Sequence, residues 1–210
     1  QAELAGACGI TVHLRGDRRH IQDRDVLLLR KTVAGVLNLE MKATAELLAT
    51  ALGIRPDMCT LVPEGEGELT TQGGLDVMAE EPQLRDAVAK LKESGITVSL
   101  FIDPDVVQVG RAKAVGADIV EIHTGIFAEA TDPDEIQREF EKVRVAAIAA
   151  TEMGLKAHGG HGLTYRNVQA IAGIGEIAEV SIGHSVVSRA VLVGMDLAVR
   201  EMLVLLEAPA

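Results

Sequence analysis

The sequence has few aromatic residues, only two cysteines and no long run of apolar residues. Its 210 residues include one Tyr, three Phe and no Trp, so Val, Ile, Leu and Ala must fill the core. Cys8 and Cys59 fit neither a disulfide framework nor a metal motif, which predicts a cytoplasmic location. Because no stretch of about 18 apolar residues and no basic leader is present, neither a membrane span nor a secretory signal is predicted.

Basic charge is also scarce. The chain carries 31 acidic and 20 basic residues, a net charge of −11. Binding to a nucleic-acid backbone requires a basic surface, so nucleic acid is excluded as the main partner. The length predicts one domain over residues 1–210.

Short apolar segments alternate with longer amphipathic ones along the whole chain. The short segments are rich in branched residues and bounded by Gly, Pro or Asp, which is typical of buried strands. They cover residues 9–14, 35–41, 58–63, 96–102, 118–124, 154–160 and 179–184. The helical patterns cover residues 23–33, 44–54, 81–94, 134–153, 164–174 and 187–208. This alternation predicts βαβ units and a parallel sheet.

A weak internal repeat favours a (β/α)₈ barrel. Four segments, at residues 5–14, 92–101, 114–123 and 152–161, place a Gly between a helical pattern and a strand, as expected of a helix C-cap. One strand and one helix in each repeat describe a TIM barrel better than a doubly wound sheet, which is the alternative and would need a glycine-rich dinucleotide motif. Seven strands after a partial helix predict that an eighth strand precedes Gln1.

Titratable residues gather at the predicted strand ends. All six histidines, including His13, His123, His158 and His161, fall in or just after a strand, where barrel enzymes place their catalytic groups. Glu40 and Glu121 lie inside otherwise apolar strands. A buried carboxylate must find a partner or raise its pKa, so each is a candidate acid or base, and a structural ion pair is the competing interpretation.

Glycine and arginine clusters follow other strands. The segments HGGHG (158–162) and IGHS (182–185) predict a phosphate site, because free N–H groups at a helix N-terminus favour an anion. Arg15, Arg18, Arg19 and His20 form a basic loop that either binds a second anion or is simply solvated. The segment 64–74 resembles a substrate loop. His158, His161 and Glu121 remain open as metal ligands, although their spacing matches no strong motif.

Several motifs together resemble the pyridoxine 5′-phosphate synthase family. They are GITVHLRGDRRHI, NLEM, LVPE with LTTQGGLDV, SLFID, EIHTG, GHGLTYRNV and IGHS, in this order, and the resemblance extends from Gln1 to about Leu206. It implies a (β/α)₈ barrel, an octamer, and no metal or organic cofactor. The implied reaction condenses 3-amino-2-oxopropyl phosphate with 1-deoxyxylulose 5-phosphate.

The same resemblance implies roles for particular residues. His13 and Glu40 would exchange protons, His161 would donate one, and Glu121 would stabilise a transition state. The expected contacts of the deoxyxylulose phosphate are Arg15, His20 and Thr70. Those of the amino-ketone phosphate are Gly162, Gly183 and His184. The family's first strand has no counterpart here, in line with the expected eighth strand.

Two other functions remain as alternatives. A phosphosugar epimerase or isomerase would share the barrel and its phosphate loops but use a metal or one acid–base pair. A non-catalytic barrel would bind the phosphate ligand without turnover.

Overall fold

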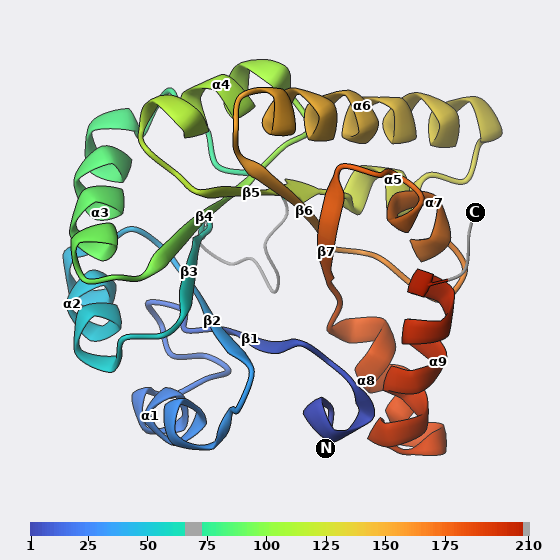
Figure 1. Cartoon of the computed structure of the whole chain (residues 1–210), viewed down its shortest axis with the longest axis horizontal. Helices are drawn as coiled ribbons and strands as arrows, with labels where there is room; N and C mark the ends of the chain where they lie inside the picture. Colours follow the sequence, from blue (N-terminus) through green and yellow to red (C-terminus); the bar gives the residue numbers. More distant parts are fainter. Residues whose placement is uncertain (66–72, 208–210) are drawn as a thin grey trace.

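A curled parallel sheet forms the centre of the protein in a computed structural model that describes residues 1–65 and 73–207. Within these residues, seven strands lie side by side in chain order, and each neighbouring pair is parallel. Figure 1 shows the sheet curling until its first and last strands face each other, with helices around the outside. This order confirms the predicted barrel arrangement, because a doubly wound sheet would reverse its strand order.

The elements have the following bounds. The strands are β1 (Gly9–His13), β2 (Val36–Met41), β3 (Met58–Leu61), β4 (Thr97–Ile102), β5 (Ile119–His123), β6 (Lys156–Gly160) and β7 (Ile177–Ser181). The helices are η1 (Glu3–Ala5), α1 (Asp23–Thr32), α2 (Ala45–Ile54), α3 (Glu81–Glu93), α4 (Val106–Ala114), α5 (Gly125–Glu129), α6 (Pro133–Glu152), α7 (Val168–Ala172), α8 (His184–Val193) and α9 (Met195–Glu207).

The predicted strands are confirmed to within a few residues, but the last helical segments differ. The helix expected over 187–208 is two helices, because Gly194 adopts φ +84° and interrupts it. The helix expected over 164–174 shortens to α7, since the Asn167 side chain accepts hydrogen bonds from Thr164 and forms a turn. Helix α4, which begins at an Asp105 cap, lies outside the predicted segments.

The two faces of the sheet have opposite chemistry. On the outer face, side chains such as Leu39, Leu100 and Ile122 are fully buried against the helices. Alternate residues point the other way, and there Asn38 accepts a hydrogen bond of 3.0 Å from Thr60. The prediction that Val, Ile, Leu and Ala fill the core therefore holds between sheet and helices, whereas the barrel interior is polar.

The facing edges of β1 and β7 form what we call the seam. Neither edge pairs with a further strand in the part of the chain that the structure describes. Helices α8 and α9 lie on this side of the molecule, close to η1 (Figure 1). No helix in the described ranges is long and apolar enough to cross a membrane.

Candidate active site

A cavity of about 1020 Å³ occupies the barrel interior and extends along the seam. Nine of the ten residues predicted for the site line it. They are His13, Arg15, His20, Glu40, Glu121, His161, Gly162, Gly183 and His184. Thr70, the tenth, lies outside the described residues. Predicted site residues that are more than 170 positions apart in the sequence, such as His13 and His184, therefore line one common cavity.

The strand register explains why these side chains meet. His13 ends β1 and lies beside Glu40 of β2. Glu121 of β5 lies beside His158 of β6, and His161 follows the end of β6. Because the carboxyl ends of parallel strands meet at one edge of a sheet, residues from four strands reach the same volume.

Among the described residues, Glu40 and Glu121 are the carboxyl groups whose pKa is raised to near or above neutral pH. Burial raises the pKa of Glu40 to about 7. Burial, followed by the negative charges of Glu40 and Glu179, raises the pKa of Glu121 to about 8. A side chain at Gly160 would overlap the Glu121 carboxyl, so glycine there leaves room for that group. Both carboxyls can hold a proton near neutral pH, as acid–base catalysis requires.

His13 lies between two carboxyl groups. Its Nε2 is 3.1 Å from an oxygen of Glu64, and its Nδ1 is 4.0 Å from an oxygen of Glu40. The other Glu64 oxygen accepts a hydrogen bond from the Gly16 N–H at 3.1 Å, which anchors this carboxylate. Burial lowers the pKa of His13, although the hydrogen bond and charge of Glu64 oppose that shift. A largely neutral imidazole can accept a proton.

Anion-binding features occur on both sides of the cavity mouth. The Arg15 side chain is buried and its Nε has no hydrogen-bond partner, although an Asp17 oxygen is 3.4 Å away. Opposite it, Gly183 caps the N-terminus of helix α8 and His184 begins that helix. Open space surrounds the position that a Gly183 side chain would occupy. A buried guanidinium whose Nε makes no hydrogen bond and a helix N-terminus are both suited to phosphate.

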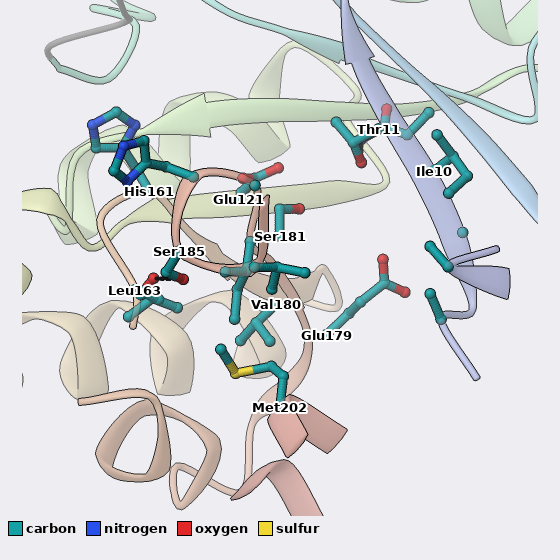
Figure 2. A pocket seen from close by; sticks show the side chains of 18 of the residues that line it. Ile10, Thr11, Glu121, His161, Leu163, Glu179, Val180, Ser181, Ser185 and Met202 are labelled. Atoms are coloured by element: carbon teal, nitrogen blue, oxygen red, sulfur yellow. Dashed lines mark hydrogen bonds between the residues drawn. The ribbon is translucent and has the colours of Figure 1, made fainter. Parts of the chain in front are cut away.

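Four residues near these groups were not predicted as site residues. Glu64 contacts His13, and His123 lies 3.1 Å from Asp103 through its Nδ1. Glu179 lines the cavity and points toward the edge of β1 beside Ile10 and Thr11 (Figure 2). His123 had two signals in the sequence, its place at a strand end and the strand alternation that puts it on the same face as Glu121, but it was given no role.

The histidines lie as the sequence predicted, with one exception. Five lie at or beyond the carboxyl end of a strand, but His158 is at the middle of β6. Among the described residues, no group of three or more His, Cys, Asp or Glu side chains is arranged to hold a metal ion. His158, His161 and Glu121, left open above as ligands, therefore do not form such a cluster.

Comparison with known proteins identifies the family of this chain. The model of the family described as "Pyridoxal phosphate biosynthesis protein PdxJ" matches residues 1–208. The pyridoxine 5′-phosphate synthase of Geobacter sulfurreducens is 57% identical over 201 residues, which cover 96% of this chain and 84% of that protein. The enzyme of the same name from Synechococcus sp. is 58% identical, with the same coverage.

Solved structures with low sequence identity share the fold. Phosphoribosyl anthranilate isomerase from Thermus thermophilus aligns with a TM-score of 0.61 at 14% identity, over 98% of this chain and 90% of that one. KGPDC from Streptococcus mutans aligns with a TM-score of 0.66 at 12% identity and the same coverage. At such identities the likeness concerns the fold alone.

Proposed function

The chain belongs to the family of the pyridoxal phosphate biosynthesis protein PdxJ, and on that premise we propose that it is a pyridoxine 5′-phosphate synthase. The reaction we propose condenses 3-amino-2-oxopropyl phosphate with 1-deoxyxylulose 5-phosphate and releases phosphate and water. The observation that carries this proposal is the pair of carboxyl groups with raised pKa values, the partly buried Glu40 and the buried Glu121, which share one cavity with His13 and His161.

The chemistry requires repeated proton transfers. The amine of one substrate attacks the ketone of the other and loses water to give an imine. Enolisation then expels phosphate, water adds, and the ring closes with loss of further water. Each step moves a proton on or off carbon or oxygen, so several groups that titrate near neutral pH must surround one pocket.

Glu40 and His13 are suited to accept these protons. The pKa of Glu40, raised to about 7, makes its carboxylate a stronger base than that of an ordinary glutamate. At neutral pH about half of this group is still ionised and able to accept a proton. His13, 4.0 Å away, has a pKa lowered by burial and so offers a neutral nitrogen. At 4.0 Å the two groups are too far apart for a direct hydrogen bond, so each would accept a proton from the substrate separately.

Glu121 and His161 are suited to the opposite task. With a pKa of about 8, Glu121 keeps its proton at neutral pH and can donate a hydrogen bond to a developing oxyanion. His161 lies at the cavity wall on the same side as Glu121 and Ser181 (Figure 2). We assign to His161 the donation of a proton to a leaving oxygen.

The two phosphate groups would be held at opposite sides of the cavity mouth. Arg15 and His20 would bind the deoxyxylulose phosphate, with Thr70 as a third contact. Gly162, Gly183 and His184 would bind the amino-ketone phosphate. Two such anchors would hold the reacting carbonyl and amine close together, which can lower a barrier by about 7 kcal/mol or more.

We also propose a homo-octamer in the cytoplasm. Support for self-association comes from α8, where Val187, Val191 and Leu192 leave large apolar side chains exposed. Both cysteines are free, which suits a reducing compartment. Light scattering coupled to size-exclusion chromatography should give a mass of about eight chains, and a monomer would contradict the octamer.

Product formation tests the activity directly. The purified protein is incubated with both phosphate substrates, and pyridoxine 5′-phosphate and inorganic phosphate are quantified by mass spectrometry and a phosphate assay. We expect equal amounts of the two products, and no product when either substrate is omitted. Tight binding of both substrates without turnover would instead indicate the non-catalytic barrel. Interconversion of a single phosphosugar would indicate the epimerase or isomerase alternative.

A further inference from the structure

The loop that carries His161 is held by the end of strand β5. His161 itself adopts φ +79°, a left-handed conformation that few non-glycine residues adopt. The buried Thr124 hydroxyl lies 2.8 Å from the carbonyl oxygen of Gly160 and 2.6 Å from that of His161, so it donates to this bend. A strained backbone persists only where its surroundings fix it, and here Thr124 does so.

The neighbouring residue of β5 contacts the imidazole ring. His123 is almost completely buried, and its ring centre is 5.2 Å from that of His161 in an edge-to-face arrangement. Phe101 packs against His123 in a second edge-to-face contact, also at 5.2 Å. A Cβ at Gly125 would overlap the His123 ring and come within 3.0 Å of the His161 ring, so glycine leaves the space in which the two rings lie.

Asp103, at the end of β4, fixes the orientation of His123. Its Oδ1 is 3.1 Å from His123 Nδ1 and also accepts a hydrogen bond from the Gly74 N–H at 2.9 Å. The hydrogen bond from His123 lowers the pKa of Asp103, so this carboxyl is ionised at neutral pH. A carboxylate only accepts hydrogen bonds, and Nδ1 of His123 must therefore carry the proton.

We propose that Asp103 and His123 are positioning residues that hold the His161 ring in the orientation in which it acts on the substrate. Asp103 fixes the tautomer and rotation of His123, and the His123 ring then limits the rotation of His161. Thr124 fixes the backbone beneath the same ring. The part of this inference that concerns proton donation rests on the proposed function, whereas the coupling of the three side chains does not.

The electrostatic surroundings agree with this arrangement. Burial lowers the pKa of His161 most, the adjacent His123 lowers it further, and Glu129 of α5 opposes both. The charged groups that face these rings are thus Asp103 from the end of β4 and Glu129 from α5. Removal of His123 should therefore raise the pKa of His161.

Steady-state kinetics of Asp103→Asn and His123→Gln test the positioning role. We expect kcat to fall about ten- to a hundredfold in each, with KM for both substrates changed less than about threefold, because a misdirected ring slows chemistry without weakening the phosphate contacts. The matched control is Asp105→Asn, two residues away, where asparagine can still cap α4. A fall in the control equal to that in Asp103→Asn would overturn the proposal.

Two further measurements separate positioning from other roles. In the double variant Asp103→Asn/His161→Asn, kcat should equal that of His161→Asn alone, since Asp103 acts through that ring, and multiplied losses would contradict this. Nitrogen-15 NMR of the histidine rings, without substrate, should show a proton on Nδ1 of His123 and an upward shift of the His161 pKa in His123→Gln. An unchanged His161 titration would refute the coupling even in an active enzyme. A protein that makes no pyridoxine 5′-phosphate but shows the shift would refute only the proposed reaction.

Discussion

Strands β3 and β5 are buried along their whole length, whereas no residue of β1 or β7 is fully buried. The difference follows from position in the sheet. Strands β2 to β6 each have two strand neighbours, and β1 and β7 each have one in the described part of the chain. Helix α8, which follows β7, likewise has no buried residue. We call β2 to β6 the closed side and compare it with the seam.

The two regions contribute different chemistry to the site. The closed side supplies groups whose acidity depends on burial, namely Glu40 and Glu121, together with the pair Asp103 and His123. The part of the seam that follows β7, which we call its border, supplies backbone N–H groups around Gly183 at the start of α8. Desolvation acts only where water is excluded, while phosphate needs an open approach. Substitutions on the closed side should therefore affect turnover, and those at this border should affect ligand binding.

The largest effect is expected at Glu40, in the closed side. Glu40→Gln is nearly isosteric, so the fold should persist, but an amide cannot accept the proton. We expect kcat to fall roughly 10²- to 10⁴-fold, with dissociation constants of both substrates nearly unchanged. Single-turnover formation of pyridoxine 5′-phosphate, with calorimetric binding in parallel, measures the two quantities.

The control for this variant is Glu141→Gln, which removes an exposed helical carboxylate paired with Arg144. Surface ion pairs of this kind contribute about 0–1 kcal/mol and no chemistry, so kcat should match the wild type. Near-normal turnover in Glu40→Gln would show that this carboxyl is only structural, and the assignment of the chemistry to the closed side would then be wrong.

Core truncations should differ in cost between the two regions. Leu100 of β4 is fully buried, and Leu100→Ala should lower the free energy of unfolding by about 2–5 kcal/mol through lost contacts and a cavity. Val180 of β7 is only partly buried, and Val180→Ala should cost about 1 kcal/mol or less. Urea unfolding measures both. Equal costs would mean that the seam is as well packed in solution as the closed side.

The free energy of unfolding should also depend on pH through Glu121, a buried group of the closed side. An unfolded glutamate ionises near pH 4.5, whereas Glu121 holds its proton to about pH 8. Between these values the folded state binds more protons than the unfolded state, so stability falls as pH rises. Glu121→Gln removes this loss and should gain several kcal/mol over the wild type at pH 8 relative to pH 5. Parallel curves for the two proteins would show that Glu121 titrates normally.

Much of the fold was predictable because local patterns match it. Strand and helix segments differ in period, and glycines punctuate them, as Gly95, Gly116 and Gly154 do with their positive φ angles. The break at Gly194 was missed although a glycine inside a helical pattern can mark a boundary. Helix α4 was missed although Asp105 is a typical N-cap residue. The polar interior was not predicted because strand alternation alone does not say which face is enclosed.

Nine of the residues predicted for the site line one cavity, but the contacts among them and their neighbours were not predicted. Glu40 and Glu121 stand out as charges inside apolar strands, and glycine-rich segments mark Gly162 and Gly183. Glu64, in the segment after β3, pairs with His13 at the end of β1. Asp103, just after β4, pairs with His123 at the end of β5. Their separations of 51 and 20 residues follow no motif, so only the register of the sheet brings them together.

The smallest effect is expected at Gly183, on the border of the seam. Its backbone angles, φ −108° and ψ −70°, lie outside the left-handed region that favours glycine, and an added Cβ would meet no atom within 4 Å. Gly183→Val should therefore keep the stability of the wild type, yet its methyl groups would occupy space that an anion needs beside the N–H groups of α8. We expect the dissociation constant of 3-amino-2-oxopropyl phosphate to rise about tenfold, or about 1.4 kcal/mol, with single-turnover rates at saturation changed little. Gly175→Val is the matched control, because Gly175 precedes the other end of β7 and its Cβ position is equally open. If Gly183→Val reduced the saturated rate rather than affinity, the seam would take part in the chemistry, and the division between the two regions would be wrong.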